Sequence, residues 1–393
     1  MNQRLSNEIT SVLSKAQIVK NLARKKFFGL FIFGLIKSRK VQFCEIAHYL
    51  NDEVKLVSNE IRIQDFFGEV EIDYQQVAIL LICLLPAKKK VCICIDRTEW
   101  DFGKTQFNIL MIVVVFGDFQ IPLYWELLDN NSGNSSAQAR KDLLELCIKV
   151  LGKERIGYIV GDREFIGHSW VKYLKDKGIL FVIRLPKHHL ITLLDGSVLK
   201  IEQLDFCHNK ALILKDCLVD GVVAHVWVKR LESGDFLFLL GTVNVEFMGQ
   251  LYRKRWTIET VFQSFKERGF DLESTHLQSI PKLKKLIALV SIAYGLCRNL
   301  GIYYHQKVHN IKTKKHGYKA VSFVRKGIDL IRQHIPPSVS WLGFCLRSIT
   351  SFFDSDFRNQ YNTNICLILN ISSEYVPEGQ NTTHCGGRKQ KAC

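Results

Sequence analysis

The stretch VCICIDRT, residues 91–98, decides the fold of this 393-residue chain. Five apolar residues lead without interruption to Asp96, a pattern typical of a buried central strand that carries a carboxylate at its end. Two more strand-like runs follow at 107–116 and 120–127, and Gly117-Asp118 between them predicts a hairpin turn. Three neighbouring strands are therefore expected in this part of the chain.

Helical and strand patterns alternate after the hairpin. The predicted elements are a helix at 138–151, a strand at 158–160 that stops at Gly161-Asp162, a helix at 165–177 and a strand at 179–185. The order is β-β-β-α-β-α-β, with an acid ending the first and the fourth strand. This order predicts an α/β fold with an RNase H-like core, which we assign to residues 88–185 and 246–272.

The segments that follow the core strands have different sequence patterns. Residues 186–245 have a strand-like pattern throughout, with glycines at the expected turns. They are expected to form a β-strand-rich insertion that interrupts the core. Residues 273–378 are expected to form a basic helical region. The polar tail at 379–393 is expected to be disordered.

Residues 1–85 are expected to form a helical N-terminal region. Apolar residues recur at helical spacing within 41–50 and again near 57–67, with a polar break between them. Two short helices around a turn suggest a helix-turn-helix that binds DNA, but a plain helical domain has the same pattern.

The charge balance favours a polyanionic partner. The chain has 54 Lys and Arg against 38 Asp and Glu, a formal net charge of +16 and an isoelectric point near 9.3. Basic residues are concentrated in 1–40, which has Glu8 as its one acid, and in 274–328, which has no acid. Nucleic acid and an anionic membrane surface both fit such a charge, which by itself does not choose between them.

Neither of the two most apolar stretches that we singled out, 27–36 and 77–85, has the roughly 20 residues that a helix needs to cross a bilayer. We therefore expect a cytoplasmic protein without a membrane partner. The 12 cysteines include no C-x-x-C pair and are expected to be reduced thiols in the core. The residues His188, His189, Cys207 and His208 lack the paired spacing of a zinc site.

Four polar residues near the end of the predicted core fall on one side of a helix. At about 100° per residue, Tyr252, Arg255, Glu259 and Lys266 lie within about 60° of one another. The adjoining apolar face, which can pack on a sheet, consists of Ile258, Val261, Phe262 and Phe265. Considered alone, this pattern also fits an exposed face with an i, i+4 ion pair.

Two further acids make this helix a candidate metal site. Asp96 and Asp162 end predicted buried strands, where an unpaired carboxylate is costly. If they converge with Glu259, the three acids can hold two divalent metal ions about 3.5–4 Å apart for phosphodiester chemistry, and Mg²⁺ is the expected ion. The alternative is that these acids cap strands and helices.

These residues resemble those of the bacterial insertion-sequence transposases of the DDE class, in the cut-and-paste group named for a Y-(2)-R-(3)-E-(6)-K signature. The spacing of Tyr252, Arg255, Glu259 and Lys266 matches the signature in full. The other blocks that resemble the family, in the same order, are DRT at 96–98 with Trp100, GNS at 133–135, and DREF at 162–165 with Gly167. The resemblance covers about residues 41–269.

The resemblance implies that Asp96, Asp162 and Glu259 are the catalytic residues and bind two Mg²⁺ ions, for which Mn²⁺ can substitute. It implies cleavage of double-stranded DNA at terminal inverted repeats through a hairpin, joining to target DNA, and a homodimer that holds both ends. The implied DNA contacts are Tyr252, Arg255 and Lys266 on phosphates, Trp256 on an extruded base, and Arg163 and Arg184 beside the strand ends. Trp256 can equally be a half-buried packing residue. A nucleoid-associated protein is expected.

The chain departs from the family at 59–67, where relatives have a basic run and this sequence has Glu60 and Asp65. End recognition is therefore expected to use other residues. Two alternatives stay open: a catalytically silent DNA-binding protein derived from a transposase, and a structure-selective nuclease on the same RNase H-like fold.

Overall fold

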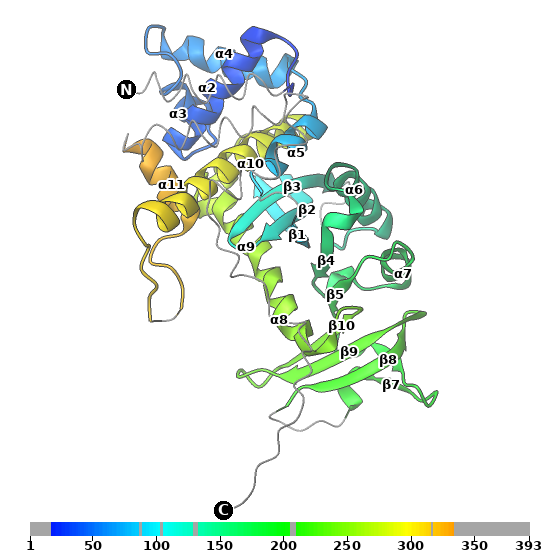
Figure 1. Cartoon of the computed structure of the whole chain (residues 1–393). Coiled ribbons are helices and arrows are strands. Elements are labelled where there is room, and N and C mark those ends of the chain that lie inside the picture. Colours follow the sequence, from blue (N-terminus) through cyan, green and yellow to red (C-terminus); the bar gives the residue numbers. More distant parts are fainter. Residues whose placement is uncertain are drawn as a thin grey trace, which may run out of the picture.

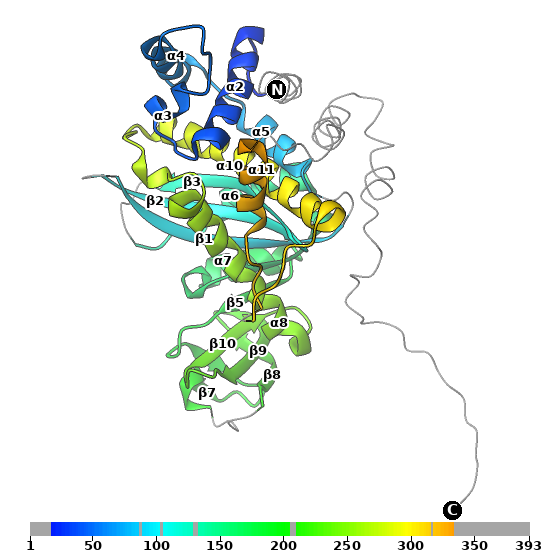
Figure 2. The ribbon, with the colours of Figure 1, turned by 90° about the vertical axis from the view of Figure 1, so that its left-hand side faces the viewer.

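The structure, a computed structural model, describes residues 17–85, 89–102, 105–128, 133–204, 210–315 and 317–333. Within these residues the chain is a mixed α/β molecule built around one ten-stranded sheet. Helices from the two ends of the described chain pack together at one end of the molecule, and the last strands of the sheet lie at the other end (Figures 1 and 2). The predicted tail at 379–393 and residues 334–378 lie outside the described residues.

The strands are β1 (Val91–Phe102), β2 (Thr105–Phe116), β3 (Phe119–Leu128), β4 (Ile156–Gly161), β5 (Phe181–Arg184), β6 (Leu190–Thr192), β7 (Val198–Lys200), β8 (Leu212–Val219), β9 (Val222–Arg230) and β10 (Phe236–Gly241). Their order in the sheet is β3-β2-β1-β4-β5-β10-β9-β8-β6-β7. The hairpin predicted at Gly117-Asp118 is confirmed, since β2 and β3 pair antiparallel across it and Gly117 has a φ of +54°. Strands β4 and β5 pair parallel next to β1.

Strand β1 is longer than the sequence indicated. It was expected to end at Asp96, but it continues to Phe102 because β2 pairs with it along this whole length. Its parallel partner β4 ends earlier, and the last pair between them is Ile95 with Gly161. Asp96 and Asp162 each follow this last pair directly, so the two acids still lie at the end of the parallel part of the sheet.

Two helices of this region pack together beside the central strands of the sheet. Helix α6 (Ala137–Leu151) forms where it was predicted and packs on β3. The helix predicted at 165–177 begins later, as α7 (His168–Asp176), because a 3-10 turn at Arg163–Phe165 and Gly167, with a φ of +129°, precede it. Figure 1 shows α6 and α7 on one side of the central strands.

The strand-rich segment predicted at 186–245 continues the central sheet. Strand β10 pairs antiparallel with β5, with Gly241 opposite Val182, and the remaining strands follow outward from it. A Cβ at Gly241 would lie 2.7 Å from the carbonyl oxygen of Phe181, so this close pairing favours glycine.

The N-terminal region is helical, with α2 (Leu22–Ser38), α3 (Phe43–Ala47), α4 (Leu56–Glu69) and α5 (Tyr74–Ile82). The buried Asn59 joins α4 to the preceding turn, since its Nδ2 donates to Ala47 O at 3.1 Å and Asn51 O at 2.8 Å. The apolar stretch at 27–36 lies in α2, and its phenylalanines pack against Phe66 and Phe67 of α4. This apolar stretch is therefore part of the folded core.

Helix α10 (Ile280–Tyr303) is the central helix of the molecule. It lies between the sheet and the N-terminal helices, and Trp125 of β3 donates its Nε1 hydrogen to Lys284 O at 3.2 Å (Figure 1). The helical stretch 280–308 is long and apolar enough to cross a membrane, but 94% of its apolar window is buried inside the structure. Such burial is equally typical of a core helix.

Several cations of the acid-free segment 274–328 point inward. Lys284 pairs with Glu126 at 2.7 Å, Arg298 donates to Asp118 O at 2.8 Å, and Lys285 donates to the carbonyl oxygens of Phe66 and Phe67. These cations stabilise the fold, so only part of the segment's positive charge is available to a partner.

Two glycines allow α10 and α11 (Phe323–Arg332) to pack with their backbones in contact. A Cβ at Gly327 of α11 would lie 1.8 Å from Cys297 O, and one at Gly301 of α10 would lie 1.9 Å from Phe323 O. The two helices can therefore pack this closely only if neither residue carries a side chain.

We predict that Gly327→Ala lowers the free energy of unfolding by at least about 1–3 kcal/mol, because the new methyl group must separate the two helices. The matched control is Gly68→Ala in α4, where an added Cβ meets nothing within 4 Å. The control should be more stable by about 0.5–1 kcal/mol. Urea unfolding measures both changes, and equal midpoints for the two variants would contradict the close packing of α10 and α11.

Candidate active site

The predicted polar residues lie on a helical segment of mixed geometry. It consists of α8 (Met248–Tyr252), a 3-10 turn (Arg253–Arg255), α9 (Trp256–Gln263) and a π-helical turn (Ser264–Arg268). The apolar face predicted for it is confirmed, since Ile258, Val261, Phe262 and Phe265 are buried. The uniform 100° per residue was wrong for this segment, because the 3-10 and π turns change the rotation on either side of α9.

The guanidinium of Arg255 joins two of the predicted acids. Its NH2 lies 2.6 Å from Glu259 Oε1 and its NH1 lies 3.5 Å from Asp96 Oδ2. The side chain of Arg255 is only 10% exposed and that of Asp96 is 15% exposed, so the pairing takes place in a largely desolvated site. The structure thus brings Asp96 of β1 and Glu259 of α9 to one cation.

The third acid, Asp162, lies at the same end of the parallel strands. Its Oδ1 accepts the backbone N–H of Arg163 at 2.8 Å and lies 3.4 Å from the Tyr252 hydroxyl and 3.9 Å from Arg184 NH1. Burial raises the pKa of Tyr252, and the negative charge of Asp162 raises it as well. Tyr252 and Arg184 therefore both lie beside Asp162.

The surroundings of Asp96 favour its neutral form, although its carboxylate contacts the Arg255 guanidinium. Its pKa is raised to about 7, first by burial and also by the carboxylates of Asp162 and Glu164, although the Arg97 N–H and the Arg255 guanidinium lower it. Carboxylates are the ligands that Mg²⁺ prefers, so the donor chemistry of the three acids fits a hard divalent cation. Within the described residues, however, no three His, Cys, Asp or Glu side chains are grouped closely enough to hold a metal ion.

The remaining predicted DNA contacts are arranged around this site. Lys266 lies on the π-helical turn, donates to Glu99 O at 3.3 Å, pairs with Glu273 at 3.2 Å and lies over the Trp100 ring. Trp256 is 62% exposed and packs against the Arg255 guanidinium at 5.4 Å, so it is not the half-buried packing residue that was the alternative. Arg163 is exposed.

A second set of contacts, for which the sequence gave no prediction, connects the three motif blocks. Arg97, which follows Asp96, donates its Nε hydrogen to Glu164 Oε2 at 3.0 Å, and Ser135 Oγ donates to Glu164 Oε1 at 3.1 Å. Ser135 in turn accepts from Arg140 Nε at 2.8 Å, and Arg97 NH1 donates to Asn108 at 3.1 Å. A half-buried ion pair therefore holds the end of β4 to β1. The sequence signal that could have suggested this ion pair is a charged residue close to each motif acid, Arg97 after Asp96 and Glu164 two residues after Asp162.

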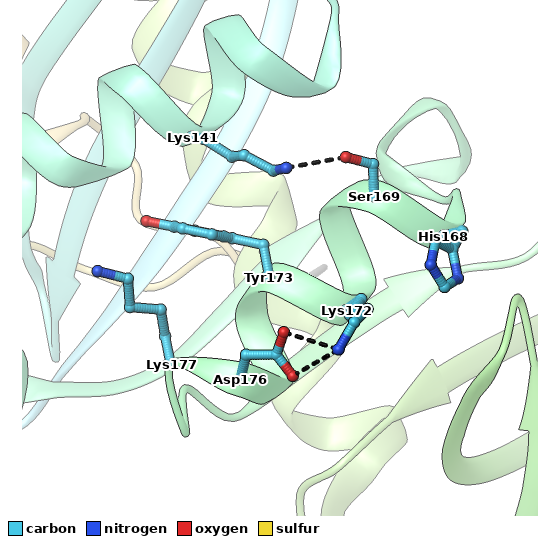
Figure 3. Close-up of a pocket in the computed structure, with 7 residues that line it drawn as sticks. All are labelled: Lys141, His168, Ser169, Lys172, Tyr173, Asp176 and Lys177. Atoms are coloured by element: carbon cyan, nitrogen blue, oxygen red, sulfur yellow. Dashed lines mark hydrogen bonds and ion pairs between the residues drawn. The ribbon is translucent and has the colours of Figure 1, made fainter.

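A separate pocket lies between α6 and α7 (Figure 3) and contains none of the three acids. Its lysines already have partners, since Lys141 donates to Ser169 at 2.8 Å, Lys172 pairs with Asp176 at 2.9 Å and Lys177 pairs with Glu145 at 2.6 Å. The predicted chemistry does not depend on it.

Of the four residues considered for zinc, Cys207 and His208 lie outside the described residues. His188 pairs with Glu202 and His189 with Asp220. Cys92 and Cys94 are buried free thiols in β1, as predicted.

Comparison with known proteins identifies the family. The family model described as "Transposase DDE domain" matches residues 87–296, just over half of the chain. The chain belongs to the DDE transposase family. It is therefore a transposase of the DDE class, an enzyme family whose substrate is DNA, and the match contains β1 to β10 and most of α10.

The other comparisons add little to this assignment. A search of curated proteins gave no match. Among solved structures, endonuclease V from Bacillus subtilis is similar at 12% identity over 54% of this chain and 95% of that chain, with a TM-score of 0.27. The TM-score is too low for this likeness to support an argument about the transposase.

We predict that Glu164→Gln lowers the free energy of unfolding of the transposase by about 1–3 kcal/mol, because it removes one of the two carboxylates that pair with the 15% exposed Arg97 and leaves only Glu99, on the same strand. In a double-mutant cycle with Arg97→Gln, the double variant should lose less free energy of unfolding than the sum of the losses in the two single variants. The control is Asp329→Asn, which breaks the more exposed pair with Arg325 and should cost less than about 0.5 kcal/mol. Additive losses in the cycle would show that the ion pair does not connect the two strands.

Proposed function

We propose that this transposase is a cut-and-paste enzyme of the Y-(2)-R-(3)-E-(6)-K, hairpin-forming group, with Asp96, Asp162 and Glu259 as its catalytic acids. The observation that carries the proposal is the contact of one guanidinium, that of Arg255, with both Asp96 and Glu259. Asp162 follows β4 at the last parallel pair with β1. The proposal is therefore supported by three acids, from two strand ends and a helix, that lie at the same end of the sheet.

We also propose an RNase H-like core, residues 88–185 and 246–272, with residues 186–245 as an insertion. The strand order β3-β2-β1-β4-β5, with β4 and β5 parallel to β1, supports this assignment. The continuation of the sheet through β10 supports the position of the insertion, after β5 and before the helix that carries Glu259.

The three acids would hold two Mg²⁺ ions, which supply an activated water and stabilise the leaving 3′ oxygen of a phosphodiester. Arg255 orients Glu259 and balances the charge of Asp96. Tyr252 and Arg184 donate toward Asp162 and are placed to bind the phosphates beside the cleaved bond, and Lys266 and Arg163 extend these contacts.

The proposed partners are the terminal inverted repeats and the target DNA, bound by a homodimer that holds both ends. A protein with these partners is expected in the cytoplasm, on the nucleoid. A binding-only relative is the main competing function, and the 15% exposed, partnered Asp96 favours the enzyme, because a binding module gains nothing from a desolvated carboxylate there.

The deciding experiment is cleavage of a labelled duplex that carries the repeat flanking the gene, with purified protein and Mg²⁺. We predict that wild type nicks the repeat boundary and forms a hairpin, and that Glu259→Ala cuts at least about a thousandfold more slowly, since several kcal/mol of transition-state stabilisation are lost. EDTA should abolish cleavage by wild type. The mutant should still bind the duplex in a gel-shift assay.

Two outcomes would contradict the proposal. If wild type binds the duplex but does not cut it, the chain is a DNA-binding protein. If it cuts a duplex with a scrambled repeat equally well, it is a structure-selective nuclease.

We predict that Trp256→Ala separates the two steps. The exposed indole is placed to stack on an extruded base, a contact worth about 1–3 kcal/mol, so hairpin formation should slow by about 5- to 150-fold while first-strand nicking stays near the wild-type rate. Trp256→Phe should restore part of the hairpin rate. Equal losses in nicking and hairpin formation would exclude the stacking role.

A further inference from the structure

The two basic concentrations of the sequence, at 1–40 and 274–328, meet on the folded molecule. The end of α2 contributes Lys37, Arg39 and Lys40, and α11 lies against it, with Lys37 Nζ donating to Arg332 O at 3.1 Å. In both views α11 lies beside α10 and near the helices of the N-terminal region (Figures 1 and 2). Segments almost 300 residues apart thus form one surface.

The end of the candidate active-site helix belongs to the same surface. Arg39 has left-handed backbone, with a φ of 62°, at the end of α2, and its NH2 donates to Arg268 O at 3.3 Å. Arg268 is the last residue of the π-helical turn. We call the cations around this contact the junction surface, and it consists of Arg39, Lys40, Arg268, Arg325 and Arg332, with Lys37 buried beneath it.

The junction surface has more cations than the nearby acids can neutralise. Lys40 pairs with Glu45 at 3.0 Å and lies near Asp271, and Arg325 pairs with Asp329 at 2.9 Å. Burial lowers the pKa of Arg39, and the positive charges of Arg325 and Arg332 lower it further. Five cations on the surface therefore face three acids, and backbone carbonyl groups hold the like charges together.

This surface lies within reach of DNA bound at the acids. Glu259 and Arg268 are nine residues apart, which would be about 13 Å along an α-helix at about 1.5 Å per residue, and the π-helical turn at Ser264–Arg268 makes the distance slightly shorter. A base pair of B-DNA rises about 3.4 Å, so the distance corresponds to about four base pairs. Both points lie on one helical segment, which keeps their separation fixed.

We propose that the junction surface binds the phosphate backbone of the transposon-end duplex about four base pairs from the cleaved bond. The proposal rests on the proposed function, because the position of the cleaved bond is set by Asp96, Asp162 and Glu259. The surface takes the role that the acid-containing segment 59–67 is poorly suited to fill, since Glu60 and Asp65 repel phosphates.

The test uses the full chain and the double variant Arg268→Gln, Arg332→Gln. Both residues are exposed, and their carbonyl groups, not their side chains, accept the hydrogen bonds of Arg39 and Lys37, so the fold should be kept. Binding of the repeat duplex is measured by fluorescence anisotropy over a range of salt concentrations. Two lost phosphate contacts should make the slope of log K against log salt shallower by about 1.8, and the affinity at 0.1 M salt about tenfold weaker or more.

The control removes the same charge elsewhere, with Lys149→Gln and Lys153→Gln at exposed positions in α6 and just after it. Its slope should stay that of wild type. Phosphate-ethylation interference adds the position: ethylation about four base pairs from the cleaved bond should weaken binding of wild type and have less effect on the double variant. An unchanged slope, equal changes in both variants, or interference unaffected by the substitutions would overturn the proposal.

The outcome is independent of cleavage. If wild type binds the repeat duplex without cutting it, the proposed function fails, while the salt slopes still decide whether the junction surface binds DNA.

Discussion

Arg255 allows buried carboxylates to be placed at the end of a β-sheet. Asp96 is held among apolar residues and close to other acids, and an isolated charge there would cost several kcal/mol. The guanidinium of Arg255 neutralises part of this charge and also contacts Glu259. Because Arg255 is itself largely buried, the helix that carries it has to pack against β1, and this packing fixes Glu259 relative to the strands.

The sheet determines where this charge cluster can form. Strand β1 continues past β4 because it has β2 on its other side, so the parallel pairing stops at Ile95 and Gly161 although β1 does not. A carboxylate next to this last pair therefore lies where β4 no longer pairs with β1. The ion pair between Arg97 and Glu164 then connects the two strand ends.

The sequence predicted the local elements of this fold well. Apolar periodicity and glycine turns predicted β2, β3, α6 and β4 close to their observed bounds, because each is set by its own residues. The length of β1 could not be predicted in this way, since it depends on pairing with β2. The same applies to the irregular helix around Arg255, where a 3-10 and a π turn accommodate contacts with residues far away in the chain.

For the site residues, too, the sequence predicted what depends on local spacing and missed what depends on distant contacts. The spacing of Tyr252, Arg255 and Glu259 predicted which residues share a face, and the structure places Arg255 and Glu259 together. Neither the Arg97–Glu164 pair nor the meeting of the two basic segments could be predicted, because both depend on contacts between distant parts of the chain. Basic residues were also overcounted as surface charge, since composition does not distinguish Lys285, buried against α4, from the exposed Arg325.

Buried lysines explain why the two ends of the described chain pack as one unit. Lys37 of α2 donates to the last carbonyl group of α11, and Lys285 of α10 donates to carbonyl groups in the last turn of α4. Each cation stabilises the negative end of a helix from the other part of the chain.

Burial lowers the pKa of both lysines to about 8, so each contact carries a desolvation cost. Leucine at either position would avoid this cost but would remove the donor to Arg332 O or to Phe67 O, and the lysines therefore specify which helix ends meet. The Lys37 contact also places the junction surface beside the active-site helix, since Lys37 holds α11 close to the point where Arg39 contacts Arg268.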